Sequence, residues 1–178
     1  MHHRLWPVFD AAFCVRAGAS AVMVVLPLQL QAVEVTHCVP PEQSVFSCTT
    51  GTKIVAVCRT PELTADSGAL QYRFGLPAAL ELSFPPAGAD WRVVTRGGTV
   101  AFSGGGGAWL AFTNARYRYV VYSAVGQGWG SKAGVVVEKD GKRIATLACK
   151  GVATSELGPD LFSKAGVEAV EGDFDLPR

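Results

Sequence analysis

Histidine is nearly absent from the chain. Only three of the 178 residues are histidine, and His2 and His3 stand at the very start. His37 is the third. A zinc site built from histidines needs several of them, and a Ser-His-Asp triad needs one as its base. The sequence therefore predicts no metal site, no cofactor and no histidine-dependent catalytic residues.

Charge is also scarce. Charged residues make up 17% of the chain, and the net charge is only +1. The lysines and arginines are scattered rather than gathered in runs. A nucleic-acid partner requires a strongly basic surface, and so does electrostatic attraction to an anionic membrane. We therefore expect neither, whereas the 49% content of hydrophobic residues indicates a folded domain.

The N-terminal apolar run lacks the length of a membrane span. Residues Ala17–Ala32 carry no charge, and Arg4 and Arg16 precede them. A transmembrane helix needs about 20 apolar residues, whereas a secretory signal has a shorter run that follows basic residues and ends at small ones. We expect residues 1–32 to be a signal peptide and residues 33–178 to form a single periplasmic or secreted domain, without a stable membrane anchor after cleavage. An uncleaved anchor is the alternative.

No Cys-x-x-Cys pair occurs, which argues against a zinc knuckle or a thioredoxin-type site. The mature part contains an even number of cysteines, which in an exported chain predicts two disulfides among Cys38, Cys48, Cys58 and Cys149. The segments around Cys48 and Cys58 indicate a hairpin that turns at Thr50-Gly51. The two cysteines would then be about five residues out of register, beyond the ~7 Å limit on Cα separation. We therefore expect Cys149 to bond to Cys48 or Cys58, and Cys38 to bond to the other.

What the mature chain does contain is an alternation of apolar and polar residues in short segments, separated by turns rich in glycine and proline. Asp140-Gly141 is a typical two-residue hairpin turn. This pattern predicts an all-β fold, a small antiparallel barrel or sandwich of about nine strands. The expected strands include Thr52–Arg59, Ala69–Phe74, Ala79–Phe84, Trp91–Thr95, Thr99–Ser103, Ala108–Thr113, Arg116–Val125, Val135–Lys139 and Lys142–Cys149.

A helical period appears once, near the C-terminus. Residues Leu161–Val170 follow Gly158-Pro159-Asp160, where a proline and an acidic residue suit the first turn of a helix. We expect one short C-terminal helix there, followed by a loose tail from about residue 171.

The segment Ser103–Lys132 holds two aromatic strands between two glycine-rich loops. If Asn114-Ala115 is the turn, Trp109 lies opposite Val120, and alternation gives the hairpin two faces. We expect one face to belong to the core, with Leu110, Phe112, Tyr117, Tyr119 and Val121. The other face carries Trp109, Thr113, Arg116, Arg118, Val120 and Tyr122.

The same register places Ser103 opposite Gly126, so both glycine-rich loops, Gly104–Gly107 and Gly126–Gly130, lie at one end of the sheet. Glycine lets a backbone approach a partner closely, and tryptophan is a frequent interface anchor. We predict a partner-binding site made of Ser103, Gly104, Gly105, Gly106, Gly107, Trp109, Arg118, Tyr122, Trp129 and Lys132. In the alternative, the glycines form bulges or a barrel corner, Trp129 packs under its own loop, and the C-terminal helix covers Trp109 and Tyr122.

Two apparent catalytic patterns lack the context they need. Gly128–Ala133 matches the GxGxxA dinucleotide pattern, but a strand-like segment follows it where a helix is required. Glu156 and Asp160, or Glu138 and Asp140, could form carboxylate pairs. At a helix start or on a hairpin rim such residues are more often solvated, so we expect no catalytic residues.

Four segments cover most of the mature chain: Val45–Cys58, Leu70–Gly75, Phe102–Lys142 and Ser155–Phe162. They resemble a family of exported bacterial proteins that are known only as hypothetical, which implies no activity. More weakly, Ser103–Trp109 (SGGGGAW) and the architecture resemble periplasmic lysozyme inhibitors, small disulfide-bonded β-barrels that insert a Ser-Gly-rich loop with an aromatic end into the lysozyme cleft. Here Trp109 stands in place of tyrosine, and the glycine run is longer.

Together these features predict a non-enzymatic binding or inhibitory module that recognises an unidentified protein or envelope ligand. Inhibition of a lysozyme is its most concrete version. The alternatives are an envelope hydrolase that uses carboxylates, or Ser103 without histidine, and an immunity protein against a secreted toxin.

Overall fold

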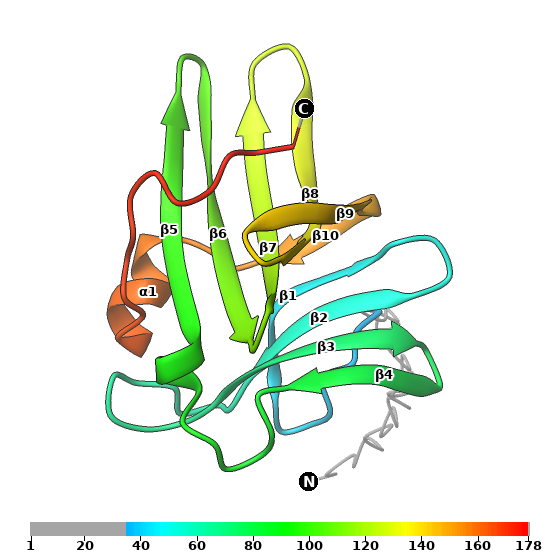
Figure 1. The fold of residues 1–178 in the computed structure, drawn as a ribbon, viewed down its shortest axis with the longest axis vertical. Coiled ribbons are helices and arrows are strands. Elements are labelled where there is room, and N and C mark those ends of the chain that lie inside the picture. The colour runs from blue at the N-terminus through cyan, green and yellow to red at the C-terminus, as the bar shows by residue number, and fades with distance from the viewer. Residues whose placement is uncertain (1–34, 178) are drawn as a thin grey trace, which may run out of the picture. The chain divides into compact units, whose positions relative to one another are not determined.

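The computed structural model describes residues 35–177, and the expected signal peptide lies outside them. Within this range, ten strands form two five-stranded antiparallel sheets (Figure 1). In sheet A the strand order is β10-β1-β2-β3-β4, and in sheet B it is β5-β6-β7-β8-β9. The all-β prediction is confirmed, in the form of a sandwich-like pair of sheets and not a closed barrel.

Sheet A consists of β1 (Gln43–Thr49), β2 (Ile54–Arg59), β3 (Leu70–Leu76), β4 (Ala79–Phe84) and β10 (Lys150–Ser155). Sheet B consists of β5 (Thr95–Phe102), β6 (Gly105–Asn114), β7 (Tyr117–Gly126), β8 (Gly130–Lys139) and β9 (Lys142–Ala148). The other elements are the 3₁₀ turn η1 (Trp91–Val94) and the helix α1 (Pro159–Ala165). The Asp140-Gly141 hairpin turn is confirmed between β8 and β9.

The main core lies between the two sheets, where apolar side chains from alternate strand positions meet. The ring of Tyr72 on β3 stacks on that of Tyr119 on β7, with centroids 5.2 Å apart, and Phe112 on β6 lies 6.0 Å from Tyr72. Burial of each large apolar side chain contributes about 1.5–3 kcal/mol. The largest fully buried side chains include Trp91, Trp109, Tyr72, Phe46, Phe112, Leu63 and Leu70.

Both predicted disulfides are present, and one of them lies at the junction of the sheets. Cys149 alone separates β9 from β10, so one stretch of chain passes from sheet B to sheet A. There Cys149 bonds to Cys48 of β1, with a Cα separation of 5.7 Å. Cys38 bonds to Cys58 of β2, with a Cα separation of 5.3 Å. The prediction that Cys149 pairs with Cys48 or Cys58, and Cys38 with the other, is confirmed.

The bounds predicted for the strands Trp91–Thr95 and Thr99–Ser103 are wrong. The first is the turn η1, whose start is capped by the carboxylate of Asp90, and β5 continues through the glycines between the two segments. These glycines form no turn. The ring of Trp109 lies against Gly98, where a Cβ atom would overlap it, so glycine is needed for close packing.

The helix α1 is shorter than the predicted Leu161–Val170. It ends at Ala165, because the next residue, Gly166, adopts the left-handed conformation (φ 66°) that commonly terminates helices. The chain then runs beside β5 as an extended segment. The N–H of Gly97 donates to the carbonyl of Glu168 (3.1 Å), and the N–H of Val170 donates to the carbonyl of Gly97 (2.8 Å).

Candidate functional site

The central hairpin turns one residue later than predicted. Ala115-Arg116 form the turn in place of Asn114-Ala115, and Trp109 pairs with Tyr122 in place of Val120. Ala115 has a positive φ of 53°, which alanine adopts rarely, so the sequence carries no clear signal for this turn. Because each partner is displaced by two residues, every side chain keeps its predicted face. The predicted core face packs against sheet A, with Leu110, Phe112 and Val121 fully buried. Its assignment to the core was wrong for Tyr117, which lies next to the turn and is 36% exposed.

The opposite face of the hairpin is covered by the C-terminal segment. The ring of Phe174 lies 5.9 Å from the rings of both Trp109 and Tyr122, and these two side chains are only 1% and 3% exposed. They are therefore not part of the exposed surface. The tail expected to be loose from about residue 171 is packed instead, because Phe174 joins a small apolar cluster on the outside of sheet B.

Arg118 is also engaged within the fold. Its guanidinium donates to the carboxylates of Glu138 (2.9 Å) and Asp173 (2.6 Å), and it lies 5.2 Å from the ring centroid of Trp109. The pair with Asp173 ties the C-terminal segment to the sheet. Arg118, like Trp109 and Tyr122, thus holds the tail in place and leaves little surface for a partner.

The two glycine-rich segments do lie together, at the end of sheet B where the β5–β6 and β7–β8 hairpins project beyond sheet A (Figure 1). Gly126 pairs with Gly105 on one side and with Gly130 on the other. The extents predicted for both loops were wrong. Only Ser103-Gly104 form the first turn, and in the second Gly126 ends β7 and Gly130 begins β8. The remaining residues of the first predicted loop belong to strand β6: Gly105, Gly106 and Gly107.

Two aromatic rings lie over glycines at this end. The ring of Phe102 covers its cross-strand neighbour Gly105, and the indole of Trp129 covers Gly126, so that a Cβ at either glycine would overlap a ring. The two rings pack on each other with centroids 5.8 Å apart. Aromatic cover of this kind shields strand glycines that have no side chain of their own. Trp129 packs on its own loop and is still 38% exposed.

A cation lies against Trp129. The ammonium of Lys132 lies 4.9 Å from the centroid of the indole, a cation–π contact. Val125, which is 59% exposed, is at the same end of the sheet but on the face opposite Gly126 and its indole cover. The N–H of Gln127 donates to the carbonyl of Gly104 (2.8 Å) and joins the two hairpins. We call this end of the sheet the tip surface, made of Phe102, Ser103, Gly104, Val125, Gln127, Trp129 and Lys132.

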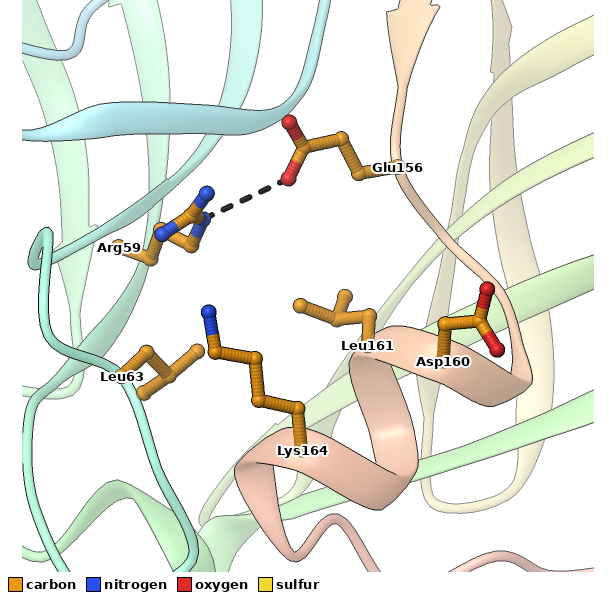
Figure 2. Close-up of a pocket in the computed structure, with 6 residues that line it drawn as sticks. All are labelled: Arg59, Leu63, Glu156, Asp160, Leu161 and Lys164. Carbon is orange, nitrogen blue, oxygen red and sulfur yellow. Dashed lines mark ion pairs between the residues drawn. The ribbon is translucent and has the colours of Figure 1, made fainter.

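The two carboxylate pairs considered for catalysis have different outcomes. Glu138 pairs with Arg118, and Asp140 accepts a hydrogen bond from Arg116 at 2.8 Å. Glu156 and Asp160 do line one cavity together, but Glu156 is paired with Arg59 and the carboxylate of Asp160 points away (Figure 2). The buried imidazole of His37 lies 3.2 Å from the carbonyl oxygen of Gly75. Over residues 35–177, no three His, Cys, Asp or Glu side chains gather where they could hold a metal, and no helix is long and apolar enough to cross a membrane.

A cavity of about 310 Å³, which the sequence analysis did not anticipate, opens between β2, the loop that follows it, and α1 (Figure 2). No local pattern could have indicated it, because its lining joins two segments far apart in the chain. The lining residues are Arg59, Leu63, Glu156, Asp160, Leu161 and Lys164.

Fold and surface together define a disulfide-bonded β-sandwich with a projecting aromatic tip and one small lateral cavity. The chain matches no family model, and it has no significant match among curated proteins or solved structures. The arguments below therefore rest on the geometry of this chain.

Proposed function

We propose that the protein is a non-enzymatic, exported binding module that recognises a partner protein through its tip surface. The observation that carries this proposal is the 38% exposure of Trp129 at the end of a projecting hairpin. Tryptophan is enriched among the few residues that dominate binding energy at protein interfaces. Its broad, rigid ring buries a large area while few rotatable bonds are immobilised.

The order already present at the tip supports this role. Trp129 is held by Gly126 beneath it and by the ring of Phe102 beside it, and Gln127 ties its hairpin to the neighbouring one. A surface fixed before binding loses less conformational entropy on association. Lys132 adds a charged rim, which favours correct orientation of a partner.

Export is supported by the disulfides. Two bonds, Cys38–Cys58 and Cys48–Cys149, link the strands of this small domain. Disulfides persist in oxidising compartments such as the periplasm or the extracellular space and are rare in the cytosol. The signal peptide lies outside the described residues and remains a prediction.

Lysozyme inhibition, the most concrete version of the proposal, draws less support from the geometry. The inhibitor-like segment Ser103–Trp109 is mostly strand β6, and its aromatic end, Trp109, is buried under Phe174. An inhibitor of the kind it resembles would present that aromatic residue on a loop. We therefore treat a lysozyme as one partner to be tested against others.

The test is capture of envelope proteins by immobilised mature protein, with bound proteins quantified by mass spectrometry. Three forms are compared: wild type, Trp129→Ala and Val152→Ala. Val152 is 99% exposed on β10 of sheet A, so its truncation removes an exposed apolar side chain away from the tip. We expect Trp129→Ala to weaken capture of the partner by about tenfold or more, and Val152→Ala to leave it unchanged.

If all three forms capture the same proteins equally, and circular dichroism shows that each is folded, the tip surface is not the binding site. A turbidity assay with purified lysozymes runs in parallel. Inhibition that Trp129→Ala abolishes identifies a lysozyme as the partner, whereas capture of a secreted toxin identifies an immunity protein.

A further inference from the structure

We propose that the cavity of Figure 2 is a binding site for a small ligand that carries a carboxylate beside a branched apolar group. The cavity lies between sheet A and α1 and shares no residue with the tip surface. The proposal therefore does not depend on the function proposed above.

Arg59 supplies the first reason. Its side chain is only 14% exposed, and its Nε lies 3.4 Å from a carboxylate oxygen of Glu156. One terminal nitrogen donates to the carbonyl of Pro61 at 3.3 Å. The Nε–H is shielded from solvent and makes no hydrogen bond within residues 35–177, so its contact with Glu156 is an ion pair without hydrogen-bond geometry. A buried donor without a hydrogen bond is unfavourable, so this site favours a better-placed acceptor.

Lys164 supplies a second cation. It projects from α1 into the cavity with its ammonium directed toward the Arg59 side (Figure 2). In the described part of the chain it takes part in no ion pair. The carboxylate of Glu156 points toward Arg59, whereas that of Asp160 points away (Figure 2). The two cations thus lie next to each other, and of the two carboxylates in the lining only that of Glu156 is directed at them.

The apolar part of the lining defines the rest of the ligand. Leu63 and Leu161, which are 1% and 8% exposed, line the same cavity. A volume of about 310 Å³ is at the small end of the range for ligand pockets. A carboxylate between Arg59 and Lys164 would place an attached branched chain against the leucines. Inorganic phosphate would match the charges but would gain nothing from the leucines.

The walls of the cavity are already ordered. Two side chains donate hydrogen bonds to carbonyl oxygens of the loop between β2 and β3. The indole N–H of Trp91 donates to Gly68 (3.1 Å), and the guanidinium of Arg92 donates to Thr64 (2.7 Å). The cap residue Gly166 lies close against the same loop. A preformed site binds a small ligand without the entropic cost of closing around it.

Glu156 is the natural competitor of the ligand. Its side chain is 51% exposed, so it can move into solvent when another carboxylate approaches Arg59. Removal of its charge should therefore strengthen binding of the ligand. The carboxylate could come from a free branched acid or from the C-terminal residue of a peptide, and both have the same chemistry at the site.

The test is a titration of the isotope-labelled mature protein, followed by amide chemical shifts. The probes are N-acetyl-leucine, its amide N-acetyl-leucinamide, isocaproate, the peptide Ala-Ala-Leu and inorganic phosphate. We expect N-acetyl-leucine to shift amides around Arg59, Leu63 and Leu161 with a Kd on the order of 1 mM, as its size allows. The amide and phosphate should bind at least about tenfold more weakly, because each lacks half of the recognised group. Tighter binding of isocaproate indicates a free acid as the source, and tighter binding of the peptide indicates a chain terminus.

Three variants complete the test. Lys164→Gln should weaken N-acetyl-leucine about three- to tenfold, and Glu156→Gln should tighten it. Lys142→Gln, which alters an exposed lysine on β9 in the other sheet, should change nothing. The proposal is overturned if the amide binds as well as the acid, if the shifts fall elsewhere, or if Lys164→Gln has no effect. Trp129→Ala leaves this titration unchanged, so failure here is distinct from failure of the tip.

Discussion

The indole ring of Trp129 lies over Gly126 at a point where a Cβ atom would overlap it. The residue proposed to contact a partner is therefore also the cover of a strand backbone. Its orientation depends on the absence of a side chain beneath it. Stability and recognition at the tip are coupled through this one contact.

Gly126→Ala tests that coupling. The new methyl group must displace the indole, and overpacking of this kind costs about 1–3 kcal/mol. We expect a lower free energy of unfolding in urea and a shifted indole N–H resonance of Trp129. Gly106→Ala is the control, because a Cβ there meets only the carbonyl oxygen of Val100 at 3.1 Å. An equal loss in both variants would mean that the indole contact is not responsible.

Phe174→Ala tests the role of the C-terminal segment. Phe174 is 5% exposed and packs on Trp109 and Tyr122, so its truncation leaves a cavity and should lower the free energy of unfolding by about 3–5 kcal/mol. Amide exchange at Val170, whose N–H bonds to Gly97, should become faster as the tail loosens. The exposed tail residue Glu171 provides the control: Glu171→Ala should change neither quantity.

The features that could be predicted from sequence are those that local alternation determines. The two faces of the central hairpin were correct although the turn was not, because a two-residue change of partner preserves the face of every side chain. The turn itself uses Ala115-Arg116, with no glycine to mark it. One excluded distance reduced the three possible disulfide pairings to two, and the excluded pair, Cys48 with Cys58, is indeed not formed.

The features that could not be predicted depend on contacts between distant segments. Phe174 lies in the polar stretch Glu171–Asp175. This stretch has no regular spacing of apolar residues to indicate that Phe174 covers a sheet. The glycines of β5 and β6 resemble loop residues in sequence, yet they are strand positions crossed by Trp109 and Phe102. The lateral cavity joins Arg59 to a helix more than a hundred residues later.

The two disulfides should contribute unequally to stability. Cys48–Cys149 closes a separation of 101 residues and Cys38–Cys58 one of 20, for which chain entropy gives about 4.7 and about 3.3 kcal/mol. Double replacement by alanine should therefore destabilise the protein more for the first pair, by about 1 kcal/mol in urea unfolding. The reverse order would show that strand contacts near Cys38 matter more than loop closure.

Glu42 makes stability depend on pH in the acidic range. Both terminal nitrogens of Arg73 donate to its carboxylate, at 2.6 and 2.7 Å, and the N–H of Val39 donates at 2.9 Å. Partial burial acts to raise the pKa of Glu42, but these hydrogen bonds and the charge of Arg73 outweigh it, so the pKa lies below its ordinary value of 4.5. With a lowered folded-state pKa, the stabilisation is present above about pH 4.5 and is lost as the pH falls through the folded value.

Glu42→Gln should therefore lower the free energy of unfolding at pH 7 by roughly 1 kcal/mol or more, and it should flatten the decline of stability below pH 4.5. Arg73 also donates to the carbonyl of His37 (2.7 Å), so the loss should loosen the segment before β1. Glu81→Gln is the control. Glu81 forms an ion pair with Lys53, but their side chains are 43% and 37% exposed, and exposed ion pairs contribute little to stability. Chemical denaturation from pH 3 to pH 7 measures both effects. If the two variants lose stability equally and with the same pH profile, the Arg73–Glu42 pair is no more than a solvated surface contact.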